Sequence, residues 1–124
     1  MAVQLDHTIV AARDRDASAA FLADVLGLPP PGTYGPFAVV TLANGVSLDF
    51  AAEADVRPRH YAFLVTESEF DAILGRIRDR GLRFWADPFE RHPGEINTND
   101  GGRGVYWHDP DGHVLEILTV PYGG

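Results

Sequence analysis

Two stretches of the chain share a pattern that carries a carboxylate at the same place. Residues 44–50 read NGVSLDF and residues 111–117 read DGHVLEI, and the two align position for position. The alignment places Asp49 at the position of Glu116. A carboxylate flanked by apolar neighbours on a strand is costly to bury unless it is paired or binds a metal ion. The repeat therefore predicts two related carboxylate positions that need partners.

A histidine opens a strand-like run upstream of each carboxylate. His7 begins HTIV in the first half, and His60 begins HYAFLV in the second. A single histidine on a strand is more often a hydrogen-bonded structural residue than a ligand. Because imidazole and carboxylate groups together bind divalent transition metals, their duplicated placement makes a metal site between two similar modules the leading hypothesis.

Composition and charge narrow the classes of function. The 124 residues are 45% hydrophobic, carry a formal net charge of −8 and include no cysteine. The charge argues against nucleic acid and anionic membrane surfaces as partners, and the absence of cysteine excludes disulfides and thiolate metal sites. The segment 1–7 has no basic or long apolar region, so we expect no signal peptide and a cytoplasmic location.

The hydrophobic pattern predicts the same order of elements in each half, with a linker at 53–59. In the first module, about 3–52, we expect a helix with an apolar face at 16–26. Three strands are expected at 5–11, 37–42 and 46–51. In the second module, about 60–120, we expect a helix at 68–80. Four strands are expected at 60–65, 82–86, 104–108 and 113–119. The predicted helix faces are Ala17, Ala20, Phe21, Val25 and Leu28 in the first, and Phe70, Ile73, Leu74 and Ile77 in the second. Each half is therefore β-α-β-β-β or close to it.

Strand alternation predicts which way the candidate ligands point. Side chains two residues apart share a face, so Asp49 lies opposite Leu48 and Phe50 across its strand. Glu116 likewise lies opposite Leu115 and Ile117. We expect the apolar faces to be covered by the helices and the ionisable side chains to lie on the other side.

The second half also carries the most specific motif of the chain. Residues 105–116, VYWHDPDGHVLE, resemble the closing motif of the vicinal oxygen chelate superfamily, which includes glyoxalase I, fosfomycin-resistance enzymes, bleomycin-resistance proteins and extradiol dioxygenases. Residues 5–8 and 59–63 resemble the two ligand-bearing opening strands of that superfamily. The resemblance implies one α+β domain over residues 1–124, in which two tandem βαβββ modules curl their sheets around a metal and substrate cavity.

The resemblance also implies a ligand set. By position, His7, His60 and Glu116 hold a divalent ion, which can be Fe, Mn, Ni, Zn or Co. Asp49 falls where glyoxalase I has a fourth ligand, and it is a candidate base or fourth ligand here. The superfamily commonly builds such sites across a homodimer, so His7 is expected to serve with His60 and Glu116 of the same or a partner chain.

The loop 87–103 and the strand that follows it supply further candidates and some departures from the family pattern. Arg103 is predicted to clamp an anionic oxygen, and Tyr106 to donate a proton. Asn97 and Asn99 are also candidates, with turn geometry as their alternative role. Extradiol enzymes carry a catalytic histidine in this region, whereas residues 97–102 read NTNDGG.

The predicted function is a metal-dependent enzyme acting on a small substrate chelated through adjacent oxygens, of lyase, isomerase or dioxygenase type. The alternative is a metal-free protein that sequesters a drug, as in bleomycin resistance; the acidic charge would suit a cationic drug. A third possibility is a degenerate module that serves only in interactions.

Overall fold

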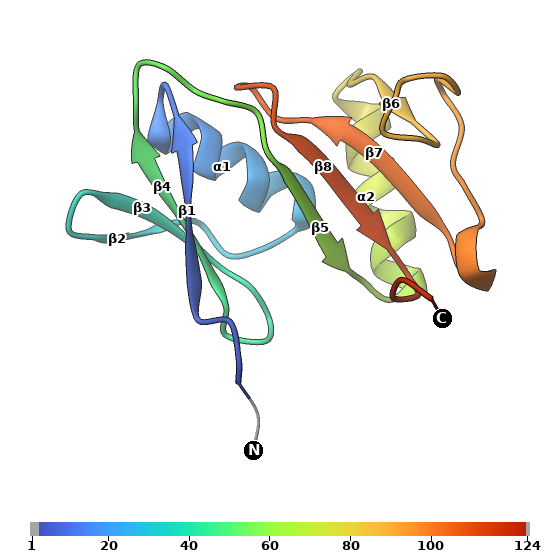
Figure 1. Ribbon diagram of the computed structural model, residues 1–124, viewed down its shortest axis with the longest axis horizontal. Helices are drawn as coiled ribbons and strands as arrows, with labels where there is room; N and C mark the ends of the chain where they lie inside the picture. Colours follow the sequence, from blue (N-terminus) through green and yellow to red (C-terminus); the bar gives the residue numbers. More distant parts are fainter. Residues whose placement is uncertain (1–2, 124) are drawn as a thin grey trace. The chain divides into compact units, whose positions relative to one another are not determined.

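The computed structural model describes residues 3–123 and divides the chain into two compact units, Met1–Arg57 and Pro58–Gly124. Each unit contains one helix and one four-stranded mixed sheet (Figure 1). The predicted α+β class with two βαβββ modules is confirmed. In residues 3–123, none of the helices has the length and apolar character that crossing a membrane requires.

The first unit has the element order β-α-β-β-β, with β1 His7–Ala12, α1 Arg15–Leu26, β2 Gly32–Tyr34, β3 Phe37–Thr41 and β4 Ser47–Ala52. Its strands lie in the order β1-β4-β3-β2. β1 and β4 are parallel, and the other neighbouring strands are antiparallel.

The second unit repeats this plan with β5 His60–Leu64, α2 Glu67–Asp79, β6 Phe84–Trp85, β7 Gly104–His108 and β8 Val114–Leu118. A short 3₁₀ turn, Asn99–Gly101, precedes β7. The strands lie in the order β5-β8-β7-β6, and again only the first two are parallel.

The same type of turn precedes β4 in the first unit and β8 in the second. The N–H of Gly45 donates to the carbonyl of Leu42 at 3.0 Å, and the N–H of Gly112 donates to the carbonyl of Asp109 at 3.1 Å. Both glycines have φ 87°, a conformation that residues with a Cβ rarely adopt. The duplication seen in the sequence is therefore also present in the backbone hydrogen bonds.

Helix α2 follows the predicted pattern closely. Thr66 and Glu69 form a capping box at its start, in which each side chain accepts a hydrogen bond from the backbone of the other. Gly81, with φ 65°, follows its end. Its four predicted core residues are all buried: Phe70, Ile73, Leu74 and Ile77.

Helix α1 begins and ends as predicted, but its buried face is not the predicted one. Asp14 caps the start by accepting from the N–H of Ala17 at 3.1 Å, and Gly27 with φ 73° ends it. The buried residues are Ser18, Ala19, Leu22, Ala23 and Val25. Only Val25 was on the predicted face. Apolar residues surround most of this helix, so the spacing defines no single stripe and tertiary packing selects the face.

Two edge strands also differ from prediction. β2 lies in a segment where no strand is predicted, and β6 is shorter than the predicted strand at 82–86. All three residues of β2 are exposed, so alternation gives no signal there. The N–H of Leu82 bonds to the carbonyl of Ile77 and so closes the end of α2 instead of entering the sheet.

The apolar core lies between each helix and its own sheet. Leu48 and Phe50 are buried in the first unit, as are Leu115 and Ile117 in the second. Figure 1 shows α2 lying along one face of β7 and β8. The other face of each sheet carries no helix of its own unit, and the candidate ligands belong to that face.

Candidate metal-binding site

Glu116 is a buried carboxylate in the middle of the second sheet. It stands between Leu115 and Ile117 on β8 and is 2% exposed. The register places Ala62 of β5 on one side of it and Tyr106 of β7 on the other. Because water does not reach this carboxylate, its charge has to be balanced by neighbouring polar groups or by a bound cation.

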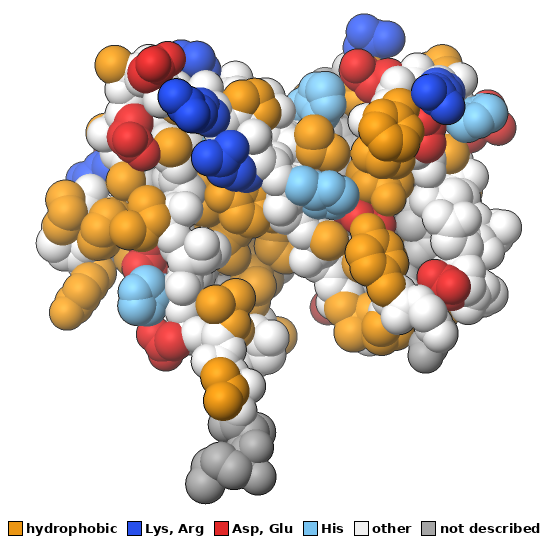
Figure 2. Space-filling model, viewed as in Figure 1, with side chains coloured by type: hydrophobic (Ala, Val, Ile, Leu, Met, Phe, Trp, Pro, Cys, Tyr) orange, Lys and Arg blue, Asp and Glu red, His pale blue; other side chains and the backbone are white. Residues whose placement is uncertain are grey.

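His60 provides the nearest of these groups. Its Nε2 lies 2.9 Å from Oε1 of Glu116. The register pairs His60 with Val114, two residues before Glu116, so the imidazole reaches the carboxylate diagonally across the parallel pair β5 and β8. The His60 side chain remains 41% exposed, so one side of the pair is open. Figure 2 shows histidine side chains on this unit beside hydrophobic ones, with an acidic group partly visible between them.

Two tyrosines approach the same carboxylate. Tyr106 is buried, and its ring meets that of His60 edge-on with centroids 5.9 Å apart. Burial, followed by the negative charge of Glu116, raises the pKa of the Tyr106 phenol. The hydroxyl of Tyr122, on the turn after β8, donates to Oε1 of Glu116 at 3.4 Å, and the charge of Glu116 raises its pKa too. Both phenols therefore stay protonated at neutral pH and can donate hydrogen bonds.

The first unit places its own histidine and carboxylate in the equivalent register. His7 pairs with Ser47, and Ile9 pairs with Asp49, as His60 pairs with Val114. The buried Asp49 accepts a hydrogen bond from the hydroxyl of Ser47 at 2.9 Å.

The imidazole of His7 is bound to its sequence neighbour. Its Nδ1 lies 2.7 Å from a carboxylate oxygen of Asp6. That hydrogen bond, with a smaller contribution from the charge of Asp49, raises the pKa of His7. The carboxylate that contacts the imidazole is therefore Asp6 for His7 and Glu116 for His60.

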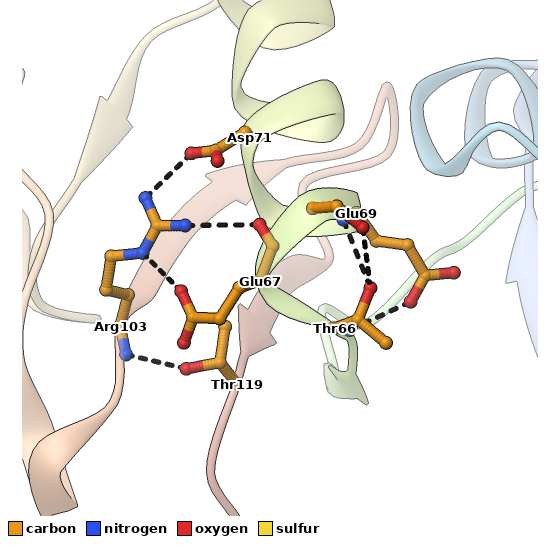
Figure 3. A network of polar contacts seen from close by, with 7 residues as sticks. Thr66, Glu67, Glu69, Asp71, Arg103 and Thr119 are labelled. Atoms are coloured by element: carbon orange, nitrogen blue, oxygen red, sulfur yellow. Dashed lines mark hydrogen bonds and ion pairs between the residues drawn. The ribbon is translucent and has the colours of Figure 1, made fainter.

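The side chain of Arg103 contacts helix α2 and does not contact Glu116. Its guanidinium donates to the Glu67 carboxylate at 2.8 Å, to Asp71 at 2.8 Å and to the carbonyl of Glu67 at 3.1 Å (Figure 3). It also lies over the ring of Phe70, 4.4 Å from the centroid. These contacts hold the strand to the start of α2, on the sheet face that the helix covers, so this placement does not support the predicted clamp on an anionic oxygen.

The other polar candidates have structural partners. The side-chain amide of Asn97 donates to the carbonyl of Ala86 at 2.8 Å, and its oxygen accepts from the N–H of Asn99 at 3.2 Å. The buried His113 accepts the backbone N–H of Arg59 on Nδ1 at 2.9 Å. Each of these contacts fixes a loop or strand end.

The structure thus brings together His60, Tyr106 and Glu116 of the predicted set, and adds Tyr122. Within residues 3–123, no three side chains of the His, Cys, Asp or Glu type are arranged to hold a metal ion. The complete ligand set of His7, His60 and Glu116 therefore stays a prediction. The sequence does not indicate a role for Tyr122, because this residue follows the last strand, where alternation no longer predicts the direction of a side chain.

Comparison with known proteins identifies the family of the chain. The family profile described as Glyoxalase/Bleomycin resistance protein/Dioxygenase superfamily matches residues 4–117. The glutathione transferase FosA of Serratia marcescens is 30% identical over 124 residues, a match that covers 94% of this chain and 81% of that protein.

Two solved structures are much more similar. The structure named Oxidase ChaP-H1 is 71% identical, superposes with a TM-score of 0.97, and the match covers 99% of this chain and 100% of that one. Oxidase ChaP-H2 is 62% identical with a TM-score of 0.96, over 100% of this chain and 98% of that one. The chain belongs to the glyoxalase, bleomycin resistance protein and dioxygenase superfamily.

Proposed function

We propose that this protein is a divalent-metal-dependent oxidase that acts on a small molecule bound through adjacent oxygens. His60 and Glu116 hold the ion, with His7 as the predicted third ligand. The protein is proposed to act as a homodimer, because closed two-fold dimers are the commonest soluble oligomers.

The geometry of the His60–Glu116 pair carries this proposal. Ligand nitrogen and oxygen atoms lie about 2.0–2.2 Å from a divalent ion, so two ligands at a right angle are about 3.0 Å apart. The 2.9 Å between Nε2 of His60 and Oε1 of Glu116 fits that spacing. Glu116 is also buried, its two tyrosine contacts carry no charge, and a cation bound beside it would balance a carboxylate charge at this position.

The residues around the pair have complementary roles in the proposed reaction. When bound, a redox-active ion such as Fe(II) would act as a Lewis acid and as an electron donor. Tyr106 keeps its proton because burial and Glu116 raise its pKa, so it can donate a hydrogen bond to a substrate oxygen that gains negative charge. Asp49, on the first unit, remains the proposed base or fourth ligand.

The similarity to the structures named as oxidases supports the choice of oxidation among the reactions of the superfamily. At 71% identity over nearly the whole of both chains, the likeness extends well beyond the fold. The 30% identity to the glutathione transferase FosA favours a second candidate, the transfer of glutathione to a substrate. Consumption of oxygen and consumption of glutathione distinguish the two reactions.

Metal analysis of anaerobically purified protein tests the proposal. We would incubate the wild type, Glu116→Ala and Glu53→Ala separately with Fe(II), Mn(II), Ni(II) and Zn(II), then measure retained metal. Glu53 is an exposed carboxylate of the first unit, directly after β4, and serves as the matched control. Near-stoichiometric metal in the wild type and Glu53→Ala, lost in Glu116→Ala, is the expected result. No retained metal in the wild type would refute the proposal and direct the search to aromatic ligands of a binding protein.

A further inference from the structure

Tyr122 combines an exposed ring with a hydroxyl directed at a buried group. The residue is 74% exposed, yet its hydroxyl reaches Oε1 of Glu116, which is 2% exposed. A tyrosine that served only as surface would leave its hydroxyl hydrogen-bonded to water. The turn after β8 instead carries this phenol back to the helix-free face of its sheet.

The contact completes the surroundings of Glu116. The neighbouring strands give the carboxylate a phenol from β7, Tyr106, and an imidazole from β5, His60. Tyr122 adds a second phenol from outside the sheet, and its hydroxyl also interacts with that of Tyr106. Three groups from three segments of the chain therefore fix one buried carboxylate.

We infer that Tyr122 is a positioning residue for Glu116, which holds the carboxylate in the orientation that faces His60. The inference rests on the proposed function in one respect, since that orientation matters for binding a cation. Hydrogen-bonding partners of a ligating carboxylate commonly control metal affinity without touching the ion. Tyr106 shares the task, but it is 6% exposed and part of the sheet, whereas Tyr122 can be removed with little disturbance of the core.

The first test uses metal-free protein and depends on the contact alone. In protein labelled with ¹³C in its tyrosine rings, we would compare the wild type with Glu116→Gln by NMR. The signals of Tyr122 and Tyr106 are expected to move, because the charge they face is removed. Tyr34 is 76% exposed and belongs to the other unit, so its signals serve as the control. Tyr122 signals that stay in place while the Tyr106 signals move would overturn the inference.

The second test measures metal affinity in Tyr122→Phe, with Tyr34→Phe as the matched control. Calorimetric titration with Co(II) is expected to show binding about three- to ten-fold weaker in Tyr122→Phe, at or below the range usual for such partners because the contact is long and exposed. The visible spectrum of bound Co(II) should change as well, which a mere loss of stability would not produce. Affinity and spectrum equal to those of the wild type would refute the positioning role.

The two tests separate failure of the inference from failure of the proposed function. If the wild type binds no Co(II) or other divalent ion, the proposed function fails, and the NMR comparison alone decides whether Tyr122 positions Glu116. If the wild type binds metal and Tyr122→Phe binds it equally well, the proposed function stands and the inference falls.

Discussion

The two units share a backbone plan but treat their histidine and carboxylate differently. In the second unit His60 lies 2.9 Å from Glu116, whereas in the first unit His7 binds Asp6 and Asp49 accepts from Ser47. The strand registers are equivalent, so the backbone does not cause the difference.

Side-chain length and one neighbouring hydroxyl account for it. Asp49 is shorter than Glu116 by one methylene, and the hydroxyl of Ser47 lies two residues away on the same face. Val114 occupies the equivalent position in the second unit and offers no hydrogen bond, so Glu116 extends to His60 instead. A duplicated fold can therefore keep both ligand positions while building the contact in one unit only.

The largest expected effect tests whether the two cores are equivalent. Leu48 and Leu115 occupy matching buried positions facing the helices. Replacing either leucine by alanine should lower the free energy of unfolding by about 2–5 kcal/mol, because a cavity replaces packed side-chain atoms. Urea denaturation followed by circular dichroism measures both.

Ile9→Ala is the control for this pair, because Ile9 is largely exposed. Its cost should be within about 0.5 kcal/mol. Costs for Leu48→Ala and Leu115→Ala that differ by more than about 2 kcal/mol would show that the shared register does not bring shared packing.

The next effect concerns the length of the carboxylate. Glu116→Asp withdraws the carboxylate by about 1.5 Å, the length of one carbon–carbon bond, and so gives the second unit the geometry of the first. We expect divalent-metal affinity to fall about ten- to hundred-fold, as measured by competition with a chelating dye.

Two further variants sharpen the comparison. Val114→Ser introduces the hydroxyl that the first unit has at Ser47, and it should weaken metal binding less than Glu116→Asp does. Asp24→Glu is the control, since it lengthens an exposed carboxylate of α1 by the same methylene and should leave the metal affinity unchanged. Wild-type affinity in Glu116→Asp would mean that side-chain length does not explain the difference between the units.

The sequence predicted the sheet faces better than the contacts on them. Alternation was enough to place Leu115 and Glu116 on opposite faces, because both lie inside a regular strand. It did not indicate that Asp6 would take the imidazole of His7, since that depends on side-chain rotamers. Tyr122 lies beyond the last strand, where no periodicity applies.

For Arg103 the strand pattern indicates the direction of the side chain, but the composition of the neighbouring loop suggested a different role. It precedes β7 by one residue, and its alternation with Val105 already places it on the helix-covered face. The functional expectation came from the polar loop 87–103, which carries no directional signal. For α1 the limit was compositional, because a helix that is apolar on most sides does not specify which one it buries.

A smaller effect on stability is expected from the arginine that links the helix to a neighbouring strand in each unit. In the second unit Arg103 near the strand donates to Asp71 on the helix, whereas in the first unit Arg15 on the helix donates to the carbonyl of Pro36 near the strand. Arg103→Ala should lower stability modestly at neutral pH, because exposed ion pairs contribute little. Thermal unfolding monitored over a range of pH measures it.

The pH dependence gives this prediction its sign. The hydrogen bond from Arg103 holds the pKa of Asp71 below its usual value, so the contribution is present above the unfolded pKa, about 3.9, and is lost as the pH falls through the folded pKa. The difference between wild type and Arg103→Ala should therefore shrink in acid. Arg15→Ala is the control and should converge much less, since its hydrogen-bond acceptor is a carbonyl and its ion pair with Asp16 is long, 3.6 Å.

The smallest expected effect is confined to one imidazole. The hydrogen bond to Asp6, followed in the same direction by the charge of Asp49, raises the pKa of His7, so Asp6→Asn should lower that pKa, as followed by an NMR titration of the metal-free protein. A raised histidine pKa contributes stability below the unfolded value of about 6.5 and loses it as the pH rises through the folded value, so Asp6→Asn should matter only on the acid side. His60 is the internal control, because Arg59 occupies the position that Asp6 has before His7. If the pKa of His7 does not fall in Asp6→Asn, Asp6 is not what distinguishes His7 from His60, and the contrast between the units reduces to the carboxylates alone.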